Sequence, residues 1–136
     1  VRDRTRPAWG RPNSLEGPGV LCHRYDADLE RYKSFTPNAR VDLGGAAAWI
    51  RLGGQLRVGD LETGGALGVR ASVAKLLGLA RLVGSTEVLF QTWPGTPLDD
   101  ALEEIAPGLP SLAIMAVDAD VPLERLRVNL ADLDTF

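Results

Sequence analysis

Three carboxylates carry the most obvious chemistry in this chain. Asp60 and Glu62 are separated by one residue, and residues two apart on a strand point to the same face. Asp42 precedes them by a length of chain that one hairpin turn can fold back beside them. Hard divalent cations such as Mg²⁺ prefer clusters of oxygen ligands of this kind. The spacing therefore predicts a divalent-metal site, provided that the strand of Asp42 pairs beside the strand of Asp60.

A site of this kind would suit phosphodiester hydrolysis. That reaction needs charge stabilisation on the phosphate and a water molecule of lowered pKa, and Mg²⁺ held by carboxylates supplies both. The alternative is that Asp60 and Glu62 are solvated hairpin acids beside arginines such as Arg57 and Arg70, because structural ion pairs imitate functional clusters. The residues by themselves leave both interpretations open.

Glycine pairs and apolar periodicity indicate the elements that must position these acids. Gly44-Gly45 and Gly53-Gly54 bracket an apolar stretch, and Gly53-Gly54 is a hairpin turn signal. Apolar residues recur every three or four positions in the clearest helix, Val69 to Val83. The other expected elements are a short helix at 26–34, a strand or strand pair at 40–52, a strand at 55–63, a strand at 87–93, a helix at 98–105, a buried central strand at 112–117 and a strand at 126–130.

This order predicts an α/β fold with a mixed central sheet, in which a β-hairpin is followed by alternating helices and strands. Residues 1–19 are rich in proline, glycine and arginine, and we expect them to form an irregular basic arm. Residues 20–136 are expected to form a single α/β domain, since this length is enough for one hydrophobic core.

The order of elements, with Asp42 in the first part of the hairpin and Asp60-Leu61-Glu62 on the strand before the long helix, resembles the PD-(D/E)xK nuclease superfamily. The match is closest to the branch with Glu-x-Glu in place of Glu-x-Lys, typified by BamHI-like restriction endonucleases. It covers about residues 26–118 and rests on order and spacing. The chain departs from the motif in having Val41 where Pro is usual, Asp60 where Glu is usual, and no lysine in the motif strand.

The resemblance implies a restriction-endonuclease-like core and a nuclease that depends on Mg²⁺ or Mn²⁺. It implies nucleic acid, with DNA as the expected form, as substrate, and it is compatible with a homodimer that pairs two active sites. The implied roles are metal ligands at Asp42 and Asp60, a backbone carbonyl ligand at Leu61, a further ligand or general base at Glu62, an auxiliary acid at Glu30 and a lysine, Lys75, that reaches into the site from the following helix.

The net charge and its distribution bear on whether the protein binds nucleic acid. The 136 residues carry a net charge of −3, which argues against a generally basic surface for gripping nucleic acid. A local contact remains open, either through the arginines of the arm or through a glycine-rich loop before the long helix that would lie close to the scissile phosphate. The residues concerned are Arg2, Arg4, Arg6, Arg11, Gly64 and Gly65. The simpler interpretations are that the arm is a disordered basic leader and that the glycine-rich loop is a flexible bend.

Two rival functions follow from other parts of the chain. One is a non-catalytic binding or assembly module whose acidic C-terminal half meets a basic partner. The other is a small-ligand domain that uses residues 64–68 as an anion site.

Cys22 and His23 suggest a thiol nucleophile beside a base, but adjacent residues of a strand point apart. The single cysteine excludes an internal disulfide. No apolar run is long enough to span a bilayer, so the sequence predicts a cytoplasmic protein with no membrane partner.

Overall fold

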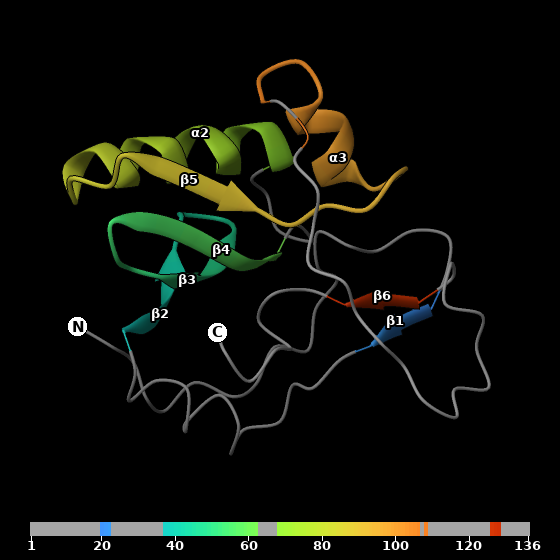
Figure 1. The fold of residues 1–136 in the computed structure, drawn as a ribbon, viewed down its shortest axis with the longest axis horizontal. Coiled ribbons are helices and arrows are strands. Elements are labelled where there is room, and N and C mark those ends of the chain that lie inside the picture. Colours follow the sequence, from blue (N-terminus) through green and yellow to red (C-terminus); the bar gives the residue numbers. More distant parts are fainter. Residues whose placement is uncertain (1–19, 23–36, 63–67, 107, 109–125, 129–136) are drawn as a thin grey trace.

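The largest described unit of the molecule is a four-stranded mixed sheet with a helix packed against it (Figure 1). The structure is a computed structural model that describes residues 20–22, 37–62, 68–106, 108 and 126–128. The strand order is β2-β3-β4-β5, and a separate two-stranded sheet pairs β1 (Val20–Cys22) with β6 (Leu126–Val128) in parallel. The expected α/β class with a mixed sheet is therefore confirmed.

Strands β2 (Asn38–Asp42), β3 (Ala47–Arg51) and β4 (Gln55–Glu62) form an antiparallel meander. Gly44 and Gly45 have φ values of 71° and 108° in the first turn, which is closed by a bond of 2.8 Å from Leu43 N to Ala46 O. Positive φ is easily adopted by glycine. The turn therefore divides 40–52 into a strand pair, one of the two expected arrangements, even though the alanines before Trp49 favour a helix by propensity.

A β-bulge at Gly59 sets which residues of β4 face the helix. Trp49 pairs with Asp60 and Ile50 pairs with Val58, so Gly59 is the extra residue on β4. Because of that extra residue, Val58 and Leu61 lie on the same face although they are three positions apart. The bulge explains why the alternation of apolar residues along this strand is only loose.

Helix α2 (Val69–Leu82) covers one face of the meander. Its Val73, Leu76 and Ala80 join alternate strand residues in one buried core. That core comprises Leu43, Ala46, Ala48, Ile50, Leu56, Val58, Leu61, Val73, Leu76, Ala80 and Leu98. The helix ends where expected, since Val83 is its C-cap and Gly84 follows at φ 72°. We call the covered side of the sheet the helix face.

Strand β5 (Glu87–Phe90) follows α2 and pairs with β4 in parallel. Helix α3 (Pro97–Leu102) begins after Thr96, whose side chain accepts a hydrogen bond from Asp99 N, as an N-cap does. Both elements are shorter than expected, because β5 ends at Phe90 and α3 ends at Leu102. The expected helix at 26–34, the expected strand at 112–117 and the expected basic arm lie outside the described residues.

Candidate functional site

The face of the sheet opposite α2 is polar, and all three predicted acids belong to it. Core residues alternate along each strand, so the residues between them point the other way. We call this side the polar face. Its residues are Asn38, Arg40 and Asp42 on β2, Ala47, Trp49 and Arg51 on β3, and Arg57, Asp60 and Glu62 on β4.

The strand register orders the predicted acids in two cross-strand rows. Asp42 pairs with Ala47, which pairs with Glu62, and the adjacent row holds Arg40, Trp49 and Asp60. The expectation that the strand of Asp42 pairs beside the strand of Asp60 is wrong, because β3 lies between them. Two hairpin turns separate the acids instead of one. The backbones of Asp42 and Glu62 are thus about 10 Å apart, twice the spacing of neighbouring strands.

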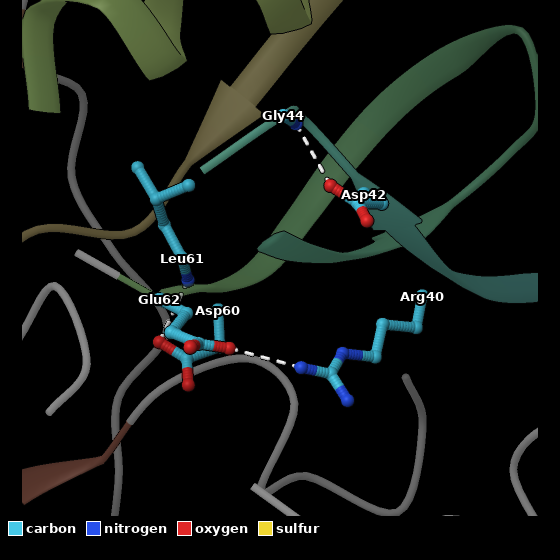
Figure 2. Close-up of polar contacts among 6 residues, drawn as sticks. All are labelled: Arg40, Asp42, Gly44, Asp60, Leu61 and Glu62. Atoms are coloured by element: carbon cyan, nitrogen blue, oxygen red, sulfur yellow. Dashed lines mark hydrogen bonds and ion pairs between the residues drawn. The ribbon is translucent and has the colours of Figure 1, made fainter. Parts of the chain in front are cut away.

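Two of the acids, Asp60 and Glu62, are buried, and Glu62 forms an ion pair with Arg40. Only 2% of Asp60 and 5% of Glu62 is exposed. The Glu62 Oε2 atom lies 2.9 Å from Arg40 Nη2 (Figure 2), and both side chains of the pair are mostly shielded from water. Asp60 Oδ1 accepts a hydrogen bond of 2.8 Å from Leu61 N. Burial of a carboxylate is costly unless it is paired or hydrogen-bonded, so Arg40 offsets part of the cost of burying Glu62.

Asp42 differs from the other two acids in being exposed. Its Oδ1 atom accepts a hydrogen bond of 2.8 Å from Gly44 N, which binds the carboxylate to the β2–β3 turn (Figure 2). An aspartate that bonds the backbone two residues ahead stabilises a turn of this kind. Asp42 therefore has a structural role that the sequence analysis does not assign to it.

Lys75 lies at the same turn but on the other side of the sheet. It belongs to α2, and its Nζ atom donates a hydrogen bond to the carbonyl of Leu43. A Cβ atom on Gly44 would lie 3.3 Å from Nζ, so the ammonium group packs closely on the turn. The lysine is thus next to the turn that Asp42 stabilises, whereas Asp60 and Glu62 belong to the polar face.

The predicted metal ligands are only partly assembled. Within the residues that the structure describes, no group of three or more His, Cys, Asp or Glu side chains is placed to hold a metal ion. Asp60 and Glu62 share a face and offer the hard oxygen donors that Mg²⁺ prefers. Their chemistry fits such an ion, and the Arg40 guanidinium already pairs with one of them. The side chain of Leu61 lies in the core, and only its backbone carbonyl is available as the predicted ligand.

Several predicted residues cannot be placed relative to these acids. The auxiliary acid, the arginines of the arm and the glycine-rich loop lie outside the described residues: Glu30, Arg2, Arg4, Arg6, Arg11, Gly64 and Gly65. The same holds for His23. In the described part of the chain, no helix has the length and apolar character needed to cross a membrane.

The sequence analysis missed two residues of this face, Arg40 and Asn38. Both alternate with Asp42 along β2, so the period of two that groups Asp60 with Glu62 would also have grouped them. Beyond the site, Arg70 on α2 pairs at 3.0 Å with Glu104, which follows α3. The hydrogen bond to Glu104 and its charge raise the pKa of Arg70, and those of Arg70 lower the pKa of Glu104.

Neither a protein-family model, nor a curated protein, nor a solved structure matches this chain.

Proposed function

We propose that this domain is a Mg²⁺-dependent nuclease of the PD-(D/E)xK type, built on a restriction-endonuclease-like core and acting on DNA. The observation that supports the proposal best is the placement of Asp42, Asp60 and Glu62 on one face, at one end of the meander. Buried carboxylates beside a specific charged partner are a recurring feature of functional sites. A homodimer would bring two such sites to one duplex.

In this mechanism Asp60 would hold the cation, and the further candidate ligands are Glu62, the backbone carbonyl of Leu61 and the Asp42 carboxylate. When bound, Mg²⁺ supplies charge stabilisation on the phosphate and a water molecule of lowered pKa. If Glu62 is not a ligand, it would accept the proton of the attacking water, and Arg40 would hold the Glu62 carboxylate in position. Arg40 is also a donor for the phosphate, since guanidinium groups bind phosphate oxygens in pairs of hydrogen bonds.

Thermal unfolding in EDTA, Mg²⁺ and Mn²⁺ tests the metal site. We expect the metal to raise the melting temperature of the wild type, because a ligand that binds only the native state stabilises it. Asp60→Asn and Glu62→Gln should remove that rise. Glu103→Gln is the matched control, since Glu103 is an exposed acid that caps α3 and should leave the metal response unchanged.

Cleavage assays on duplex and single-stranded DNA test the activity itself. Asp60→Asn and Glu62→Gln should abolish cleavage, and Asp42→Asn should reduce it, while all three variants keep the wild-type circular dichroism spectrum. Full activity of Asp60→Asn in Mg²⁺ would contradict the proposal.

A second candidate function, a non-catalytic binding or assembly module, is favoured by one contact. The Arg40–Glu62 pair gives an acid of the polar face a cation from the chain itself, and a carboxylate satisfied in this way has less need of a metal. A melting temperature that is the same in EDTA, Mg²⁺ and Mn²⁺, together with no cleavage of any DNA, would make this module the better description.

A further inference from the structure

The polar face ends in a basic row at the side away from Asp42 and Glu62. Asn38 on β2 pairs with Arg51 on β3, and Arg51 pairs with Arg57 on β4. This row, here called the basic row, lies four residues along β3 from Ala47. At the rise of an antiparallel strand that separation is about 13 Å. The polar face therefore changes from acidic at one end to basic at the other.

The two arginines of the basic row face each other directly. Arg51 and Arg57 are register partners across β3 and β4, and like charges directly opposite in a sheet destabilise it. Arg57 is exposed and Arg51 is half-buried, so an ion from solution can reach this end of the face. An anion bound at the exposed Arg57 would lower the repulsion between these two cations.

The third member of the row is a buried amide with unused hydrogen-bonding capacity. Asn38 is 0% exposed, and within the described part of the chain neither its Nδ2 nor its Oδ1 atom has a hydrogen-bond partner. Nearly all buried polar side-chain atoms in proteins are hydrogen-bonded, so an exception calls for an explanation. A ligand oxygen at the basic row would give the Nδ2 donor a partner.

An acid on the adjoining strand is already bonded to a neutral side chain. Glu87 on β5 is the register partner of Gln55, which precedes Arg57 by two positions on β4. Gln55 Nε2 donates a hydrogen bond of 2.5 Å to Glu87 Oε2. Glu87 thus lies diagonally across from Arg57, and its Oε2 atom is bonded to an amide rather than to a guanidinium group.

We propose that the basic row is a binding subsite for a backbone phosphate of nucleic acid. The inference deepens the proposed function, on which it rests for the class of ligand. Two guanidinium groups can each offer a pair of N–H donors to phosphate oxygens, and the Asn38 amide adds a neutral donor. Contacts of this kind position a nucleic acid without reading its sequence. None of the three residues that define the row is an acid, so we expect the row to bind its ligand without a metal ion.

The test is binding of a fluorescein-labelled single-stranded DNA, measured by anisotropy in EDTA. Arg57→Glu should weaken binding about tenfold, since a hydrogen-bonded charge contact is lost. Arg57→Gln should reduce the slope of log affinity against log salt by about 0.7, the value for one phosphate contact on a single strand. Arg57→Lys keeps the charge and should retain most of the affinity.

The matched control is Arg81→Glu, an identical charge change at an exposed position in the last turn of α2. Since α2 covers the opposite face, this variant should bind as the wild type does. Arg51→Gln supplies a second variant of the row, and melting curves in EDTA confirm that each variant is folded. The proposal is overturned if Arg81→Glu weakens binding as much as Arg57→Glu, or if no folded protein binds the probe.

Further measurements distinguish this subsite from a site for acidic protein segments, and separate its failure from a failure of the nuclease proposal. If polyglutamate competes as well as unlabelled DNA at equal charge, the row is a site for acidic protein segments and the nucleic-acid assignment falls. If Arg57→Glu and Arg51→Gln cut and bind DNA like the wild type, the subsite fails while the nuclease proposal stands. If the row binds DNA in EDTA but no metal supports cleavage, the nuclease proposal fails while the subsite stands.

Discussion

The two faces of the four-stranded sheet are built from the same strands but follow different rules. The helix face is filled by aliphatic side chains from every strand and from α2. The polar face holds rows of polar and charged residues in which two carboxylates, a guanidinium group and an amide are buried to different extents. Apolar packing is non-directional and proportional to area, whereas each polar contact depends on one partner in one place. The helix face therefore tolerates small errors of position that the polar face does not.

The largest expected effect is on the register that separates the two faces. Inserting one alanine between Asp60 and Leu61 shifts the rest of β4 by one residue, which turns Leu61 and Glu62 to the opposite faces. We expect loss of cooperative unfolding, a loss comparable to the whole stability of a domain, about 5–15 kcal/mol. Near-ultraviolet circular dichroism and urea titration measure it. Deleting Gly59 removes only the extra residue, leaves Val58, Asp60 and Leu61 in regular alternation and should still unfold cooperatively. Wild-type stability of the insertion would show that the register does not keep the two faces apart.

The next effect is on the helix face alone. Leu61→Ala empties a fully buried position between α2 and the sheet, and we expect it to lower the free energy of unfolding by about 2–5 kcal/mol. Leu82 is 86% exposed at the end of α2, so Leu82→Ala should change it by less than about 0.5 kcal/mol. Urea denaturation compares the two. An equal loss in both variants would mean that the core is not where the structure places it.

On the polar face, removing one charge should matter more than removing two. Arg40→Leu leaves Glu62 buried without the guanidinium group, and we expect a loss of about 2 kcal/mol in the free energy of unfolding. The double variant Arg40→Leu/Glu62→Leu should recover most of that loss, because replacing both partners by apolar groups also removes the cost of burying charge. A double-mutant cycle in urea gives the coupling. Simple additivity of the two single variants would show that the pair contributes nothing.

A smaller effect of opposite sign is expected at Asn38. Asn38→Leu should raise the free energy of unfolding by about 1 kcal/mol, because it removes a buried amide whose two polar atoms are unpartnered in the described structure. Thr96 is the contrast, since its equally buried hydroxyl donates to Trp93 O at 2.8 Å and accepts from Asp99 N. Thr96→Val should therefore destabilise by about 1 kcal/mol. Thermal melts of both variants show whether the stability change is positive at the buried group without a hydrogen-bond partner and negative at the hydrogen-bonded one.

The smallest effect concerns the exposed pair of Arg70 and Glu104, which lies on neither face. Because Arg70 lowers the pKa of Glu104 in the folded chain, the contribution of the pair is present above the ordinary glutamate pKa of about 4.3 and is lost as pH falls through the lower folded value. Glu104→Gln should therefore slightly reduce the loss of melting temperature between pH 6 and pH 3. Salt should weaken the effect. If the melting temperature of Glu104→Gln depends on pH as that of the wild type does, the pair does not contribute to stability.

The two faces also differ in how far the sequence predicts them. Periodicity located α2 and the apolar residues of β4, and Gly53-Gly54 located the turn between β3 and β4, because these features depend on neighbours a few positions apart. The mixed sheet followed from the order of elements. The polar face could not be predicted in the same way, since its rows depend on the bulge at Gly59 and on β3 lying between the acids. Arg40 and Asn38 were missed because their significance comes from partners on other strands.

The parallel pairing of β4 with β5 also has a consequence for the order in which the chain can fold. The β2–β3–β4 meander is joined by two tight turns, so its contacts close short loops and can form early. Gln55 meets Glu87 across a separation of 32 positions, and α2 lies between them. Contacts of long sequence separation form slowly because the loop entropy is lost before they stabilise the chain. The polar face belongs largely to the meander, so its charged rows can assemble before the α2–β5 unit has closed the sheet.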